Sequence, residues 1–186
     1  MSRTIARIAC THSNMRHRGF TLIELVVALI VSAVILAIAV PNLAAFVASS
    51  RLRASQSELV GALTLARSEA TKRGVNVVIE SLVSGTPAAG TEFNAGWRVC
   101  VDSDGDGQCK TTAPAELVVR EYPPVVGDFR FGTESAAVRT GFNSRGFLTT
   151  GEVVFTVCGK AGVTRGYRIR LEPVGIADVV EGPSCT

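Results

Sequence analysis

The sequence predicts an α+β fold in which one long amino-terminal helix packs on an antiparallel β-sheet. An apolar run followed by helical periodicity fills the first third of the chain, and short β-rich runs separated by Gly and Pro fill the rest. The strands are gathered after the helix instead of alternating with further helices, and this order favours α+β over a parallel α/β arrangement. The length of 186 residues fits one domain with a membrane segment added.

The apolar run extends from Phe20 to Ala48 and carries a single charged residue, Glu24. It exceeds the roughly 20 residues that a helix needs to cross a bilayer core. We therefore expect a single transmembrane segment at about residues 20–46, in the inner membrane. Only arginines, and no acids, precede the run, which predicts a cytoplasmic amino terminus and a periplasmic domain after the helix.

The residues around Gly19 are ordered differently from an ordinary secretory signal, whose cleavage site follows the apolar stretch. Here Arg16-His17-Arg18-Gly19 comes first, and Phe20-Thr21-Leu22-Ile23-Glu24-Leu25 follows at once. This arrangement resembles the class III signal of type IV pilins and type II secretion pseudopilins. The resemblance implies that a prepilin peptidase cleaves after Gly19 and methylates the new terminus, Phe20. An uncleaved signal anchor would not explain Glu24.

The predicted leader, residues 1–19, could begin at Met15, which would give a short leader typical of the family. The longer leader holds four arginines and both histidines, so cleavage lowers the basic count from 19 to 15, against 16 acidic residues. A net charge of −1 gives no global attraction to nucleic acid. Without histidine, Ser-His and Cys-His catalysis is excluded. We expect a structural protein that is not an enzyme and needs no cofactor.

Glu24 is the residue that the membrane environment singles out, because an ionised carboxylate in a bilayer or helix bundle is costly unless it is paired. Resemblance to pilins implies that its partner is the amino terminus of a neighbouring subunit, a pairing that would set axial register in a filament. The partners implied are other pilin subunits, major and minor, which meet through the amino-terminal helix, together with the prepilin peptidase and the inner membrane.

The helix is predicted to continue to residue 74. Pro41 predicts a kink or hinge, although a proline tolerated near the membrane surface is the alternative. Gly74, after a basic last turn, predicts the helix end. An apolar stripe for packing on the sheet is formed by Leu52, Leu59, Leu63, Ala66 and Ala70.

The junction between helix and first strand carries a second resemblance. Ala66 to Val75, followed by Val77-Val78-Ile79, is similar to the corresponding junction of the GspH/FimT group of minor pilins and pseudopilins. This resemblance implies a pilin fold and the role of a minor type IV pilin, a structural subunit for pilus assembly or priming. A type II secretion minor pseudopilin H is the alternative.

Residues 75–186 are predicted to form the antiparallel β-domain. Ser84 to Gly90 and the Pro123-Pro124 pair are expected to be loops. The strands are predicted at Val75 to Ser81, Trp97 to Val101, Leu117 to Glu121, Phe129 to Gly132, Val153 to Cys158 and Tyr167 to Glu172.

Four cysteines follow the apolar run, and this even number favours disulfides in an oxidising compartment. Cys100 and Cys109 bracket an Asp/Gly-rich turn, so the simplest pairing is Cys100–Cys109 with Cys158–Cys185. Three connectivities remain open.

The same turn contains Asp102, Asp104 and Asp106 in the spacing of the first half of a calcium loop. Ala113 stands where that loop requires a bidentate Glu. A weak Ca²⁺ site is therefore an alternative to a plain β-turn, and the turn is favoured.

A cluster of basic residues near the end predicts a competing function, a minor pilin that binds DNA for uptake in natural transformation. Its cations could contact phosphates while Tyr167 stacks on a base. The Gly-Arg-x-Arg element of such relatives aligns with Gly175 to Asp178, which lacks both arginines, so DNA binding is not favoured. The basic candidates are Lys160, Arg165, Arg168 and Arg170.

Overall fold

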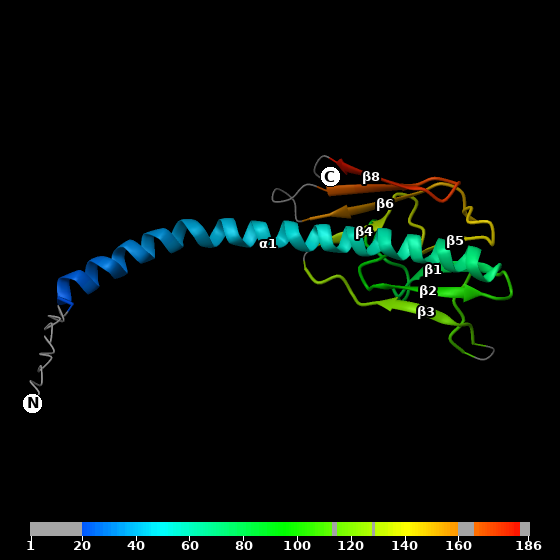
Figure 1. Ribbon diagram of the computed structural model, residues 1–186, viewed down its shortest axis with the longest axis horizontal. Coiled ribbons are helices and arrows are strands. Elements are labelled where there is room, and N and C mark those ends of the chain that lie inside the picture. The colour runs from blue at the N-terminus through cyan, green and yellow to red at the C-terminus, as the bar shows by residue number, and fades with distance from the viewer. Residues whose placement is uncertain (1–19, 113–114, 128, 160–165, 183–186) are drawn as a thin grey trace, which may run out of the picture. The chain divides into compact units, whose positions relative to one another are not determined.

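A computed structural model of the chain describes residues 20–112, 115–127, 129–159 and 166–182. These residues form one helix and eight strands, within two compact units of residues 1–41 and 42–186 (Figure 1). The elements are α1 (Leu22–Arg73), β1 (Asn76–Ser81), β2 (Trp97–Asp102), β3 (Val118–Tyr122), β4 (Arg130–Thr133), β5 (Arg139–Phe142), β6 (Val153–Cys158), β7 (Gly166–Leu171) and β8 (Ala177–Gly182).

The strands form two four-stranded antiparallel sheets, β3-β2-β1-β5 and β4-β6-β7-β8, where the sequence predicts one. Strands β6, β7 and β8 follow one another as a meander, whereas β5 returns to pair with β1. The division depends on which distant strands pair, and local sequence patterns carry no information on that choice.

Six strands lie within one residue of their predicted bounds, and β6 matches them at both ends. Strands β5 and β8 were not predicted. Strand β5 is short and contains Gly141, which lies close to the Val77 backbone. The four central residues of β8 are all exposed, so this strand lacks the alternation of apolar and polar residues that marks a strand with one buried face.

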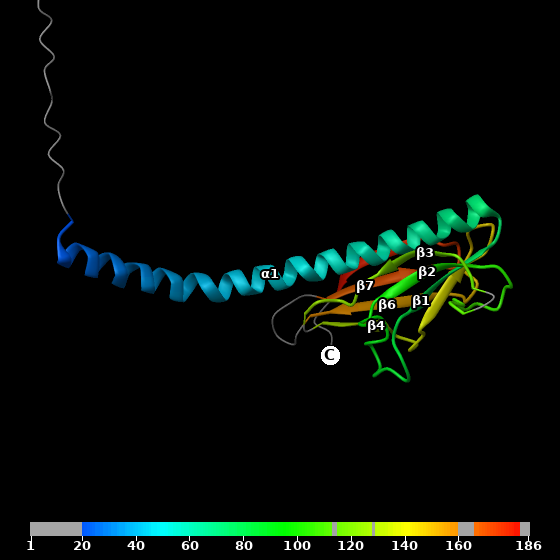
Figure 2. The ribbon, with the colours of Figure 1, turned by 90° about the horizontal axis from the view of Figure 1, so that it is seen from below.

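The second half of α1 packs on both sheets through the predicted stripe, whose members are at most 2% exposed. In Figure 1 the two sheets lie on either side of this part of the helix axis, and Figure 2 shows both beneath the same face of the helix. Aromatic rings fill the space below, where Phe93 meets Trp97, Phe131 and Phe155 at centroid distances of 5.3–6.4 Å. Burial of these side chains is the main stabilising contribution of the second unit.

The helix ends at Gly74 as predicted. Gly74 has a φ of 70°, and its N–H donates to the Ala70 carbonyl oxygen at 2.9 Å. In the last turn Arg73 donates a hydrogen bond to Glu69. This hydrogen bond, together with the positive charges of Arg73 and Lys72, lowers the pKa of Glu69, although desolvation acts in the opposite direction.

Two arginines of α1 tie the β7–β8 hairpin to the helix, about four turns apart. Arg53 Nε donates to the Tyr167 hydroxyl at 3.1 Å, and this hydroxyl donates to Glu181 at 3.4 Å. Arg67 Nη2 donates to the Val174 carbonyl oxygen at 3.0 Å, at the turn of the hairpin. Polar contacts thus hold both ends of the hairpin beside the helix.

Glu92 closes the free edge of β4. Its side chain is fully buried and accepts hydrogen bonds from the N–H groups of Gly90 at 2.9 Å and Thr133 at 3.0 Å. A Cβ on Gly132 would collide with this carboxylate, so the close approach requires glycine. The Phe93 N–H also donates to the Phe131 carbonyl oxygen at 2.8 Å. The loop therefore takes the place of a ninth strand.

Glu92→Gln should lower the free energy of unfolding of the second unit by about 1–3 kcal/mol, because the amide NH₂ would face a backbone donor and leave a buried N–H unpaired. Urea denaturation of residues 42–186 measures the effect. Glu152→Gln, at a half-exposed carboxylate, should change it by less than about 0.5 kcal/mol. Equal changes in both variants would contradict this account of Glu92.

Candidate functional sites

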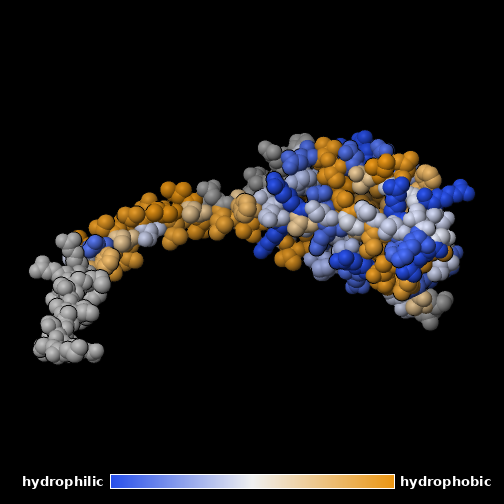
Figure 3. Space-filling model, in the orientation of Figure 1, coloured by the Kyte–Doolittle hydropathy of each residue, from blue (hydrophilic) through white to orange (hydrophobic). Residues whose placement is uncertain are grey.

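The first half of α1 presents apolar side chains on all sides. Every Leu, Ile, Val and Phe from Leu22 to Val47 is 39–81% exposed, and Figure 3 shows the apolar surface that results. The most apolar window of the helix has a mean hydropathy of 3.0, and none of it is buried. By length and composition the helix could cross a membrane. In Ser32 the hydroxyl donates to the Ala28 carbonyl oxygen, which satisfies it without water.

The start of the helix gives Thr21 a capping role that the sequence reasoning missed. Thr21 caps the helix, since its Oγ1 accepts the Glu24 N–H at 3.3 Å and its carbonyl oxygen accepts the Leu25 N–H at 3.2 Å. The Thr-x-x-Glu spacing of the capping box could have revealed this. The exposed Glu24 carboxylate has no ion-pair partner among the described residues. Phe20 is exposed, and Gly19 lies outside the described residues.

Pro41 lies within α1, which is helical on both sides of it. A hinge at this proline stays a prediction.

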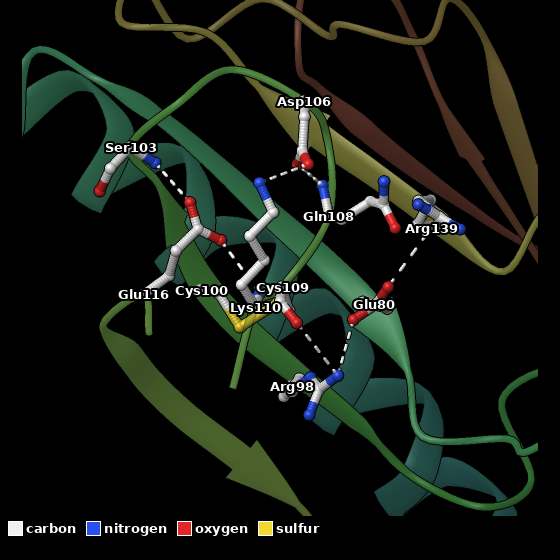
Figure 4. Close-up of a disulfide and its surroundings, with 10 residues drawn as sticks. All are labelled: Glu80, Arg98, Cys100, Ser103, Asp106, Gln108, Cys109, Lys110, Glu116 and Arg139. Carbon is white, nitrogen blue, oxygen red and sulfur yellow. Dashed lines mark hydrogen bonds and ion pairs between the residues drawn. A yellow bond between two sulfur atoms is a disulfide. The ribbon is translucent and has the colours of Figure 1, made fainter. Parts of the chain in front are cut away.

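The predicted disulfide between Cys100 and Cys109 is present, with a Cα–Cα distance of 5.7 Å (Figure 4). It draws the loop after β2 back over the sheet, where Arg98 donates to the Cys109 carbonyl oxygen at 3.4 Å and pairs with Glu80 at 2.8 Å. Cys158 is also disulfide-bonded. Its predicted partner, Cys185, lies outside the described residues.

The acidic loop that the disulfide closes is held by hydrogen bonds from its own backbone N–H groups and by ion pairs with Lys110. Asp102, 3% exposed, accepts the N–H groups of Gly105 at 2.8 Å and Gly107 at 3.1 Å. Lys110 pairs with Asp104 and, at 2.7 Å, with Asp106. The hydrogen bond from Lys110 lowers the pKa of Asp104, while those carboxylates raise the pKa of Lys110.

A calcium role for this loop stays a prediction that the geometry does not favour. The carboxylates that approach within 4.8 Å of one another are Asp102, Asp104 and Glu116, so Asp106 is not in the set. Glu116 accepts the Ser103 N–H at 2.7 Å. Lys110 supplies a positive charge beside Asp104 and Asp106.

The basic residues predicted for DNA contact are largely paired where the structure describes them. Arg168 Nε donates to Glu134 at 2.7 Å, and Arg170 lies 3.5 Å from Glu152. Tyr167 is 9% exposed, so the fold does not present its ring for stacking. Tyr167 lies on the same face of β7 as the buried Ile169, opposite the exposed Arg168 and Arg170, and this period of two could have predicted its burial. Lys160 and Arg165 lie outside the described residues.

Comparison with known proteins gives two family matches. Residues 55–175 match the model of type II transport protein GspH, and residues 14–40 match the prokaryotic N-terminal methylation motif. The type IV major pilin protein PilA of Myxococcus xanthus is 30% identical over 124 residues, which are 66% of this chain and 55% of that pilin. The chain thus spans about half of that relative.

Two solved structures share the fold. The type IV minor pilin FimU of Pseudomonas aeruginosa has a TM-score of 0.56 at 19% identity, covering 72% of this chain and 90% of FimU. The minor pseudopilin EpsH of the Vibrio cholerae type 2 secretion system has a TM-score of 0.50 at 12% identity, covering 70% and 97%.

Replacing Cys100 and Cys109 together by Ala should lower the free energy of unfolding by about 2–3 kcal/mol, because the cross-link no longer restricts the unfolded chain. Urea denaturation under oxidising conditions measures the loss. Lys110→Met, which keeps the disulfide and removes only the two partly exposed ion pairs of Lys110, is the matched control and should cost less than about 1 kcal/mol. An unchanged stability in the double variant would show that the disulfide does not brace the domain.

Proposed function

Because this chain belongs to the GspH family of pilin-like proteins and carries the N-terminal methylation motif, we propose that it is a minor type IV pilin that takes part in pilus assembly or priming. Its general role as a structural subunit of the pilin and pseudopilin class follows from the family. The minor role is supported by the helix-to-strand junction, residues 66–79, which resembles that of minor subunits.

The observation that carries the proposal is the uncovered apolar half of α1. The Leu, Ile, Val and Phe side chains from Leu22 to Val47 have no covering partner within the described chain, yet their exposure to water would be strongly unfavourable. Lipid can cover them while the subunit is stored, and helices of other subunits can cover them after assembly. A soluble enzyme or binding protein would have no use for such a helix.

The proposed maturation begins with cleavage after Gly19 and methylation of Phe20, leaving residues 20–74 as the helix and 75–186 as the periplasmic β-domain. Cleavage creates an amino group four residues before Glu24, at the start of the same helix. In the membrane the Glu24 carboxylate needs a cation, and none is available among the described residues. The amino group of Phe20 in a neighbouring subunit fits that requirement.

Glu24→Ala should insert and be cleaved normally but should enter filaments at least about tenfold less, because a buried amino group would lose its counter-charge. Immunoblots of membranes and of sheared filaments measure both steps. Glu58→Ala, at an exposed position in the second half of α1, is the control and should assemble normally. Normal incorporation of the Glu24 variant would refute the pairing.

A minor pseudopilin of a type II secretion system is the second candidate, supported by the description of the GspH family as type II transport proteins. Such a subunit would use the same helix, the same Glu24 and the same maturation. The two roles differ in the machine that the filament serves.

Deletion of the gene separates the two roles. A minor pilin predicts a loss of surface pili of at least about tenfold with secretion unchanged, because priming limits pilus number. A pseudopilin predicts the reverse. Pilus yield in sheared fractions and export of a folded secreted enzyme measure the two outcomes, with complementation by the intact gene as the control.

DNA binding stays a proposal with little support. The described cations of β7 are paired with Glu134 and Glu152, and the phosphate backbone would have to compete with both carboxylates.

A further inference from the structure

An apolar patch lies on the second unit where two loops meet near the C-terminal end of α1. Its large side chains are Phe147, Val174 and Ile176, which are 46%, 43% and 55% exposed. The loops are joined through the Leu148 N–H, which donates to the Pro173 carbonyl oxygen at 2.9 Å. Figure 3 shows apolar atoms at the surface where β7 turns into β8. We call these three residues the two-loop patch.

Arg67 of α1 holds the two loops in place. Besides its bond to Val174, its Nε lies 3.1 Å from where a Cβ on Gly146 would stand and 3.0 Å from that of Gly175. Both glycines have a φ of 79°, so each turn requires glycine. The patch is therefore built before any partner arrives, which reduces the entropy lost on binding.

Arg145 gives the patch a positive rim. It is separated from Phe147 only by Gly146, is exposed, and has no side-chain partner among the described residues. Glu172, at the base of the other loop, is an exposed acid near the patch. Two guanidinium groups, those of Arg67 and Arg145, therefore outweigh one carboxylate. An apolar centre with an aromatic ring and an arginine at its edge is the composition of protein–protein interfaces.

We propose that the two-loop patch seats another pilin-type subunit, one that presents apolar side chains and a carboxylate to Arg145. This inference rests on the proposed function, because it identifies where the subunit meets a filament neighbour. Two copies meeting through the same patch would bring Arg145 against Arg145, a repulsive contact. DNA would require several free cations along its backbone, and the patch offers one.

The test places a photo-crosslinking residue, p-benzoylphenylalanine, at position 176 or 147 of the full chain in cells that assemble the filament. Val180 is the matched control, since it is 52% exposed but lies opposite Arg168 in the β7–β8 pairing, away from the loops. Irradiation should give one adduct at positions 176 and 147, identified by mass spectrometry as a different pilin-type protein. Position 180 should give at least about tenfold less of it.

A second set of variants tests the chemistry of the contact. Arg145→Glu should reduce the adduct formed from position 176 about tenfold, whereas Arg145→Lys should retain it, because the carboxylate needs a positive charge. Thermal unfolding of residues 42–186 checks that both variants fold, as expected for an exposed side chain.

The outcomes distinguish the patch proposal from the proposed function. If the chain is present in sheared filaments but gives no adduct, or gives only a dimer of itself or an adduct with DNA or lipid, the patch proposal is overturned and the proposed function stands. If the chain is absent from every pilus and pseudopilus fraction, both are overturned.

Discussion

The covering of apolar surface on α1 is the constraint on which the rest of the structure depends. The stripe residues are buried by the chain's own sheets, whereas every Leu, Ile, Val and Phe from Leu22 to Val47 is exposed. The β-domain supplies the first cover and so holds one end of the helix in place. In the proposed function, lipid or the helices of neighbouring subunits supply the second cover.

Features encoded by short sequence patterns were predictable. The spacing of the apolar stripe identified the buried face of α1, and a glycine after a basic turn identified its end at Gly74. The disulfide Cys100–Cys109 also followed from sequence, because the two cysteines flank one turn of an antiparallel sheet. Each of these is decided by residues close together in the chain, where periodicity, backbone conformation and chain length act directly.

The remaining features join residues far apart in sequence. The Arg53–Tyr167 contact, the closing of β4 by Glu92 and the division of the strands into two sheets depend on which segments meet after folding. At the acidic loop the sequence identified Asp102, Asp104 and Asp106, whereas Glu116, from beyond the loop, approaches Asp102 and Asp104 only in the folded chain.

The two arginine ties between α1 and the β7–β8 hairpin have a mechanical consequence. In the proposed filament, tension would pull on each subunit along its helix, and the load would have to pass into the β-domain or the helix would slide across it. Arg53 and Arg67 form hydrogen bonds to the hairpin at two points along the helix. Sliding would therefore break both hydrogen bonds and disturb the packing between them. Two contacts at separate points prevent the hairpin from rotating about either one, so it resists shear along the helix.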